Sequence, residues 1–283
     1  GFYYYNGSAW VAVTPASSGW ALIGNAGTSP GTNFVGTTDN NALRFKTNNV
    51  WAGELNTNTG NASYGTNAGS SVTTGYSNVA IGAAALKTNT ANNNQVAVGD
   101  SALYNLNGGP GQNVAVGSKA MFSNSTGAYN SAYGYLSLFS NTTGTMNTAL
   151  GQASLYANTT GGQNTAVGVQ TMFSNTTGSN NVSLGINSLP SNTTGNNNTA
   201  VGSTSLYSNI TGANNTASGF RSLFSNNNGY SNVAMGAAAL YTTTANNNIV
   251  AIGDSALFSL NGGSGLNTAV GSKALFANVS GTD

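Results

Sequence analysis

The sequence predicts an all-β fold, a parallel β-solenoid (β-roll or β-helix) of 17-residue turns. One glycine recurs along most of the chain, and ten of the twelve steps between its copies are 17 residues while the other two are 18. Apolar residues keep a constant phase relative to this glycine, and they do not follow the i, i+3, i+4, i+7 spacing of a helix. Such a period is typical of stacked turns. The repeat glycines are Gly65, Gly82, Gly99, Gly117, Gly134, Gly151, Gly168, Gly185, Gly202, Gly219, Gly236, Gly253 and Gly271.

The pattern of one turn is seen in residues 147–161, NTALGQASLYANTTG. Asn147 lies four residues before the repeat glycine Gly151, and 11 of the 13 copies have Asn there. Ala149 lies two residues before it, a position that is always Ala or Ser. Leu155 lies four residues after it, where every turn but the first has Leu or Met. We interpret these residues as packing and ladder positions rather than as a reactive site.

An Asn-Thr-Thr-Gly segment, here from Asn158 to Gly161, follows an aromatic residue and closes many of the turns. The spacing predicts two short strands in each turn, represented by "NTAVG" and "SLF", with a glycine corner and a wider loop between them. Thirteen turns stacked at about 4.8 Å would form a rod of roughly 60 Å.

Both faces of each expected strand carry apolar or small residues, whereas a strand with one face in water reads apolar-polar. We therefore expect one face inside the coil and the other against a partner. A second copy of the chain is the simplest partner, and an intertwined homotrimer would provide it. One wide coil wrapped by its own loops is the alternative.

Residues 1–60 are out of phase with the repeat and are expected to form a β-rich capping or connector region before the solenoid of residues 61–283. This region holds all three tryptophans (Trp10, Trp20 and Trp51) and β-like segments at 20–23 and 42–46. Because terminal turns of solenoids need a cap, the aromatic residues predict a capping core. A carbohydrate-binding platform is the alternative.

A longer repeat lies above the 17-residue period. Residues 75–127 recur as residues 229–281, an offset of 154 residues that corresponds to nine turns. The offset keeps the phase of the coil, which indicates that a whole block was duplicated. Since the chain starts without Met and stops just after a repeat boundary, we expect a fragment or processed piece of a longer protein.

Composition excludes several function classes. Six Lys+Arg against five Asp+Glu give a net charge of +1, which provides no basic stripe for nucleic acid and no polybasic membrane patch. The sequence contains no apolar run of about 18 residues, the length that would predict a membrane-spanning helix. With neither His nor Cys, nucleophile systems and common zinc sites that use them are excluded, so we expect no cofactor or metal.

The few acidic residues give little support to catalysis. Glycoside cleavage uses two carboxylates about 5 to 9.5 Å apart. Asp100 and Asp254 occupy the same position nine turns apart, roughly 43 Å at the spacing of stacked strands, so they cannot cooperate within one chain. Asp39 with Glu54 is the remaining pair; Asp283 is the fifth acid.

Two charge pairs repeat with the block and are interpreted as structural. Asp100 and Lys119 lie at neighbouring corners, and Asp254 and Lys273 repeat the arrangement. Each pair is predicted to lie within reach of a salt bridge, of modest benefit if exposed.

Asparagine and threonine columns allow further interpretations. Six Asn-x-Ser/Thr sequences, from Asn124 to Asn209, are expected to be stacked amide ladders, because sugars on successive turns would collide. Aligned threonines suggest an ice-binding surface as an alternative function, although neighbouring threonines on extended backbone point in opposite directions. The aligned residues are Thr142, Thr159, Thr176 and Thr193.

The core "N-[TV]-A-[VI]-G-x-x-[SA]-L" resembles the head repeats of trimeric autotransporter adhesins, which use a shorter repeat. The whole chain resembles tail-fibre-like surface proteins of bacteria and phages. That resemblance rests on "NAGTSPGTNFVGTTDNNALRFKTNNVWAG" at 25–53 followed by "NTAVGxxSLxxNTTG" turns. It implies a trimeric fibre, often followed by a self-cleaving chaperone domain of the endosialidase type, which this sequence does not contain.

These observations together predict a non-enzymatic shaft or head of an extracellular fibre, on a cell surface or a phage-like particle. Its expected partners are copies of itself and a host-surface glycan or protein. The two alternatives are an ice-binding solenoid and a tailspike that processes glycans.

Overall fold

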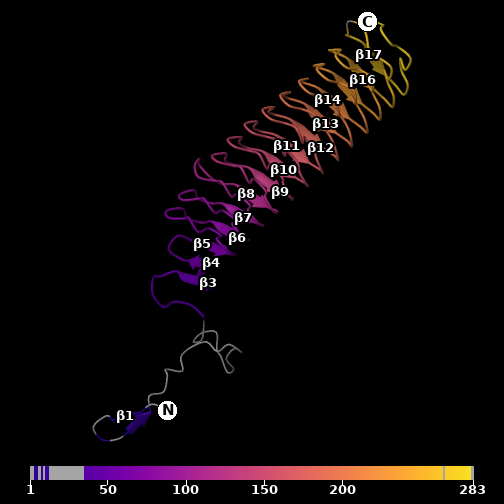
Figure 1. Ribbon diagram of the computed structural model, residues 1–283. Coiled ribbons are helices and arrows are strands. Elements are labelled where there is room, and N and C mark those ends of the chain that lie inside the picture. Colours follow the sequence, from indigo (N-terminus) through magenta and orange to yellow (C-terminus); the bar gives the residue numbers. More distant parts are fainter. Residues whose placement is uncertain (1–2, 6–7, 9, 13–34, 264, 282–283) are drawn as a thin grey trace.

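The computed structural model describes residues 3–5, 8, 10–12, 35–263 and 265–281. From β3 onward the strands follow one another along a rod in chain order (Figure 1). Strands and turns make up the described part of the chain, which contains no helix. The predicted all-β parallel solenoid is therefore confirmed, and each turn advances by one 17- or 18-residue repeat.

The coil contains thirteen strands, each hydrogen-bonded in parallel to the next one along the chain. Nearly all are three residues long. Their bounds are β5 (Asn61–Tyr64), β6 (Val79–Ile81), β7 (Val96–Val98), β8 (Val114–Val116), β9 (Ser131–Tyr133), β10 (Thr148–Leu150), β11 (Thr165–Val167), β12 (Val182–Leu184), β13 (Thr199–Val201), β14 (Thr216–Ser218), β15 (Val233–Met235), β16 (Val250–Ile252) and β17 (Thr268–Val270).

An antiparallel hairpin continues this sheet at its N-terminal side. It consists of β3 (Leu43–Thr47) and β4 (Val50–Asn56), and β4 pairs antiparallel with β5. The β-like segment expected at 42–46 thus lies in β3. A separate two-stranded sheet is formed by β1 (Tyr3–Tyr5) and β2 (Trp10–Ala12). Trp20 and the segment expected at 20–23 lie outside the described residues.

Each strand alternates between the inside and the outside of the coil. In β10, Ala149 is fully buried, whereas Thr148 and Leu150 face out and are exposed. The register of neighbouring strands keeps inward-facing residues beside inward-facing ones, because Ala149 pairs with Ala166 and Leu150 pairs with Val167. Only a small side chain faces inward from the middle of each strand, which lets the rest of the turn pack close to the sheet.

The prediction of a second strand in each turn is wrong. The "SLF" segment forms turns, and φ is +52° at Ala153 and +51° at Leu155, which is the left-handed region. The backbone is satisfied without extended geometry: Ala153 N–H donates to Tyr135 O in the preceding turn, and Leu155 N–H donates to Thr171 O in the following turn. Stacking therefore compensates for a conformation that leucine rarely adopts.

Leucine or methionine from twelve successive turns faces the strands across the interior, and most of these side chains are fully buried. The aromatic residues that follow them lie half-buried at the surface in two stacks. Tyr104 to Phe173 form one stack and Tyr207 to Phe276 the other, with ring centroids 4.9 to 5.4 Å apart; Pro190 interrupts them. The aromatic residues that the sequence pattern places on an outer face thus partly cover one another along the rod.

The repeat glycine is required at the corner that follows each strand. Gly151 has φ +135°, and a Cβ there would overlap the carbonyl of Gly168 in the next turn. Any side chain would therefore force two turns apart, which explains why the glycine marks every repeat.

Candidate functional site

Two columns of buried asparagine run through the interior, and they confirm the predicted amide ladders. Asn158 Nδ2 donates to Asn141 Oδ1 at 2.8 Å and to Gly161 O at 2.9 Å. In the other column, Asn147 N–H donates to Asn130 Oδ1 at 2.9 Å, and Asn147 Nδ2 donates to Gly161 O at 2.9 Å. These side chains are fully buried, so they hold turns together and are inaccessible to a glycan or ligand on the folded rod.

Hydroxyl groups of the aligned threonines face the backbone of the coil. Thr142 Oγ1 donates to Thr159 O at 3.0 Å, and Thr159 and Thr176 continue the same pattern. The Thr159 carbonyl also accepts the N–H groups of residues 142, 143 and 144. The hydroxyl hydrogen atoms of this column are thus committed to protein acceptors rather than presented to a solvent lattice.

The two repeated charge pairs meet through their backbones. Lys119 N–H donates to Asp100 O at 2.8 Å, and Lys273 N–H donates to Asp254 O at 2.7 Å. The prediction of a salt bridge within each pair is wrong, since no side-chain ion pair within 4.0 Å joins Asp100 to Lys119 or Asp254 to Lys273. Among the described residues, Arg44 and Glu54 form the one salt bridge. The four charged side chains are exposed, where an ion pair would contribute little.

The stacked aromatic rings expose their edges rather than their faces. Each interior ring of a stack, such as Phe139, has another ring about 5 Å away on both sides, with interplanar angles of 11° and 4°. A ligand therefore cannot stack on these rings as it would on an isolated tryptophan. The stacks contribute packing along the rod, typical of offset aromatic pairs.

One apolar column of the sheet is left uncovered. It consists of the outward-facing residue immediately before each corner glycine from Gly82 to Gly271, and we call it the sheet stripe. Leu150 is 47% exposed and Met235 44% exposed, and neighbouring members pair in register across the parallel strands. Its members are Ile81, Val98, Val116, Tyr133, Leu150, Val167, Leu184, Val201, Ser218, Met235, Ile252 and Val270.

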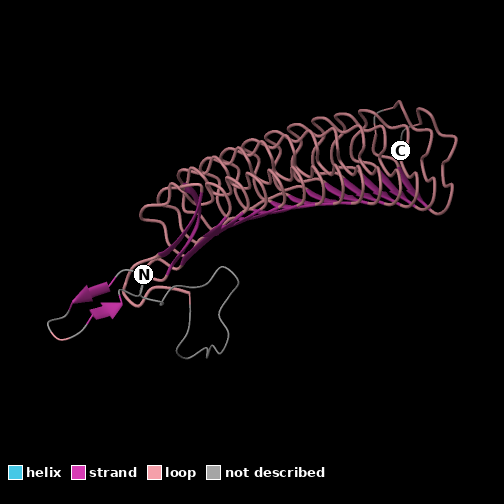
Figure 2. Ribbon diagram, turned by 60° about the horizontal axis from the view of Figure 1, so that its bottom comes forward, coloured by secondary structure: helices cyan, strands magenta, loops and turns pink. Residues whose placement is uncertain are grey.

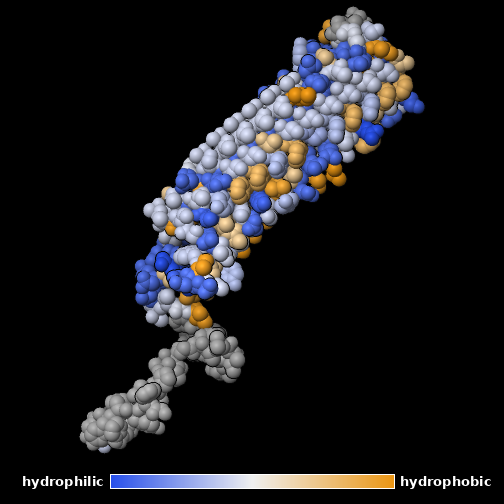
Figure 3. All heavy atoms as spheres, viewed as in Figure 1, coloured by the Kyte–Doolittle hydropathy of each residue, from blue (hydrophilic) through white to orange (hydrophobic). Residues whose placement is uncertain are grey.

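The sheet stripe contains no charged residue and is interrupted by a single polar residue, Ser218. Strands lie along one side of the rod and loops along the other in Figure 2. In the view of Figure 3, hydrophobic side chains gather in patches along one side of a mostly polar surface. A long, largely apolar stripe of this kind marks an interaction site more often than scattered apolar residues do.

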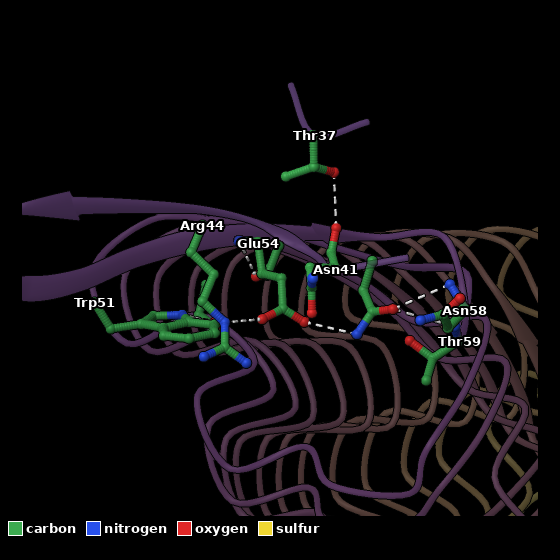
Figure 4. A network of polar contacts seen from close by, with 10 residues as sticks. Thr37, Asn41, Arg44, Trp51, Glu54, Asn58 and Thr59 are labelled. Atoms are coloured by element: carbon green, nitrogen blue, oxygen red, sulfur yellow. Dashed lines mark hydrogen bonds and ion pairs between the residues drawn. The ribbon is translucent and has the colours of Figure 1, made fainter. Parts of the chain in front are cut away.

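A polar cluster lies where the β3–β4 hairpin meets the first turn. Arg44 Nε donates to Glu54 Oε2 at 2.8 Å, and Asn56 Nδ2 donates to Glu54 Oε1 at 3.0 Å. The Arg44 guanidinium also lies over the Trp51 ring, 5.7 Å from its centroid. Figure 4 shows Glu54 between Arg44 and the loop that carries Asn58 and Thr59.

The acids considered for glycoside cleavage take part in separate contacts. Asp39 Oδ2 accepts a hydrogen bond from Asn41 Nδ2 at 2.6 Å, while Glu54 is bonded to Arg44 and Asn56. Asp283 lies outside the described residues. Over the ranges that the structure describes, no group of three or more His, Cys, Asp or Glu gathers in a way that could hold a metal ion. No helix in these ranges could cross a membrane.

Two features escaped the sequence reasoning. The apolar pattern predicts that the aromatic column faces a partner as the sheet stripe does, whereas the aromatic rings cover one another along the rod. The cavity beside Trp51 was also missed, although its signal is visible: the first turn has Gly69 where the other turns have Leu or Met.

A scan against protein-family models found no match to the chain, and searches of curated proteins and of solved structures found none either.

Proposed function

We propose that this chain is a non-catalytic, structural or adhesive segment of an extracellular fibre that associates with copies of itself along the sheet stripe. The observation that carries the proposal is the uncharged column from Ile81 to Val270, in which eight of the twelve members are exposed, the others are half-buried, and only Ser218 interrupts the apolar run. Water contact along this column is unfavourable, at roughly 25 cal/mol per Å² of apolar surface, so covering it stabilises an assembly.

A second copy of this chain fits the stripe better than an unrelated partner does. The stripe repeats at the strand spacing of about 4.8 Å, so an identical rod has matching features along its whole length. The net charge of +1 produces little repulsion between copies. Both properties favour association of like with like.

Dimensions favour a closed trimer over a pair. A sheet of three-residue strands is about 10 Å wide, and thirteen turns extend about 60 Å, which gives roughly 600 Å² per face. Stable interfaces bury about 800 Å² on each partner. Three stripes that meet on a three-fold axis bury each stripe against two neighbours and leave none exposed.

The test is the mass of the full chain in solution, measured by sedimentation equilibrium. We expect three times the 28.3 kDa chain mass for the wild type, and a monomer for Leu150→Lys/Leu184→Lys. Thr160→Lys/Thr194→Lys is the matched control, because it adds the same charges to the same two turns on the exposed loops. A wild-type monomer, or a double stripe variant that still trimerises, would contradict the proposal.

A further inference from the structure

The first turn of the solenoid borders a cavity at the position where the other turns carry a core Leu or Met. Twelve turns place Leu or Met in the interior four residues after the corner glycine, and the first turn places Gly69 there. A cavity of about 240 Å³ lies at this position, with Leu86 and Ala80 of the next turn in its lining. Trp51, Arg44 and Glu54 of the hairpin line its other side.

Backbone geometry does not explain why a glycine is present. Gly69 has φ +57°, close to +51° at Leu155 and +52° at Leu138, so leucine adopts this conformation at equivalent positions. A Cβ on Gly69 would lie 3.3 Å from Ser63 Cβ. Ser183 and Leu189 stand at the same two positions in a later turn, so a serine does not exclude the leucine.

The cavity also holds a polar group without a partner. Thr59 Oγ1 is buried, and among the residues the structure describes it has no hydrogen-bond partner. A buried hydroxyl without a partner is unfavourable, because it has lost its hydrogen bonds to water and gained none in the protein. The missing leucine and the unpartnered hydroxyl both reduce stability, and both occur at one cavity. Such local departures from good packing are typical of binding sites.

Groups in the lining are suited to a ligand rich in hydroxyls. Ser63 Oγ accepts the Glu54 N–H at 2.9 Å, which leaves its own hydrogen available to donate. The salt bridge to Glu54 occupies Arg44 Nε and leaves the two terminal nitrogens of the guanidinium. Both Glu54 oxygens already accept one bond and have lone pairs left.

Trp51 supplies an apolar wall. Its indole Nε1 donates to Ala68 O at 2.8 Å, so the N–H is satisfied and the ring contributes apolar surface. Arg44 and Glu54 neutralise each other, which makes the lining neutral overall. A neutral ring molecule with alternating hydroxyls and one apolar face matches this combination, and the volume is smaller than the roughly 300 Å³ at which pockets for drug-sized ligands begin.

We propose that this cavity, between the β3–β4 hairpin and the first turn, binds a single neutral pyranose residue of a glycan. Trp51 packs against the sugar ring, and Arg44, Glu54, Ser63 and Thr59 bond to its hydroxyls. The site is separate from the sheet stripe, so its test does not depend on whether the chain associates with itself. It gives an adhesive role a defined location at the N-terminal end of the coil.

Two substitutions test the site because each should weaken binding while leaving the fold at least as stable. Gly69→Leu fills the cavity as in the other turns, and Thr59→Val removes the unpartnered hydroxyl. Binding to the full chain is measured by saturation-transfer NMR and calorimetry with the methyl glycosides of glucose, galactose, mannose and N-acetylglucosamine. Lys46→Ala, on β3 but outside the cavity lining, is the control.

We expect at least one glycoside to bind the wild type and the control equally. Gly69→Leu should lower the affinity at least tenfold and raise the thermal unfolding midpoint, and Thr59→Val should lower the affinity about threefold with no loss of midpoint. No binding of any of the four probes to the wild type would overturn the proposal. Unchanged binding by Gly69→Leu, or a lowered midpoint without binding, would also overturn it. Trimer formation is not required for any of these outcomes.

Discussion

Residues 75–127 and 229–281 carry the same block at two places in one coil, nine turns apart, and their hydrogen bonds largely coincide. Thr88 Oγ1 donates to Tyr104 O at 2.7 Å, and Thr242 Oγ1 donates to Phe258 O at 2.9 Å. Asn92 Nδ2 donates to Gly108 O at 2.6 Å, and the equivalent Asn246 Nδ2 donates to Gly262 O at 2.8 Å. Position in the turn, rather than position along the rod, therefore determines each residue's contacts.

The two copies differ at positions in the two columns of buried asparagine, and these differences show which side chains the amide ladders require. Gln95 in the first copy accepts from Asn113 N–H at 3.2 Å, whereas Ile249 in the second offers no acceptor. Asn89 is replaced by Thr243, and Asn226 in the preceding turn is left with its Oδ1 unpartnered. A ladder thus loses hydrogen bonds wherever one member is not an amide.

The largest effect is expected in the shared leucine core. Leu103 and Leu257 are equivalent and fully buried, so Leu103→Ala and Leu257→Ala should each cost about 2–5 kcal/mol of unfolding free energy. Urea denaturation measures both, with the exposed Thr126→Ala as control, expected within about 0.5 kcal/mol of the wild type. A cost in one copy only would show that the copies are not equivalent.

Gln95 and Ile249 occupy equivalent positions in the asparagine column that contains Asn147, and exchanging them should change the stability of the two copies unequally. Gln95→Ile leaves the buried Asn113 N–H without its acceptor and should cost about 1–3 kcal/mol. Ile249→Gln introduces an acceptor near Asn267 and should be close to neutral. Hydrogen exchange at the backbone N–H groups of Asn113 and Asn267 measures the effect of each substitution locally. Equal changes of protection in the two variants would contradict the expected difference.

Repairing the ladder break should stabilise the second copy. Thr243→Asn supplies the Nδ2 donor that Asn226 Oδ1 lacks, and the expected gain is about 1 kcal/mol. The reciprocal Asn158→Thr creates the same break in the middle of the rod and should cost about 1–3 kcal/mol. Thermal unfolding of the two variants must shift in opposite directions; a shift in the same direction would refute the ladder account.

The smallest effect is expected for the repeated charges. Asp100 and Asp254 contact their lysine partners through backbone atoms, so Asp100→Asn and Asp254→Asn should change stability by less than about 0.5 kcal/mol. The change should not depend on salt. Denaturation at low and high ionic strength measures it, and a salt-dependent loss in both variants would reveal an ion pair.

Much of the coil could be predicted from residue spacing. The repeat period, the buried Ala149 and Leu155, and the ladder of Asn158 follow from a constant phase, because a stacked turn places equivalent residues above one another. The left-handed backbone at Leu155 could not be predicted: it depends on hydrogen bonds to both neighbouring turns, which no local preference of leucine reveals. An apolar pattern therefore looked like a strand where the chain turns.

The distinction between the two apolar columns also required three dimensions. Phe139 and Leu150 are both apolar at fixed phase, yet Phe139 is covered by rings of its own column and Leu150 is not. The cavity could have been inferred from Gly69, since an absent core leucine in one turn leaves a space. Its polar lining could not, because Arg44 and Trp51 come from a hairpin outside the repeat.

The association of sheet stripes is tested most directly by a single cysteine, because the chain has none of its own. Ser218→Cys places the thiol on the sheet stripe. Thr211→Cys places it on an exposed loop of the preceding turn, away from the stripe. If stripes meet on a common axis, mild oxidation should couple Ser218→Cys chains rapidly at low protein concentration and leave Thr211→Cys chains single. Equal coupling of both variants, or none at Ser218→Cys, would contradict self-association through the stripe.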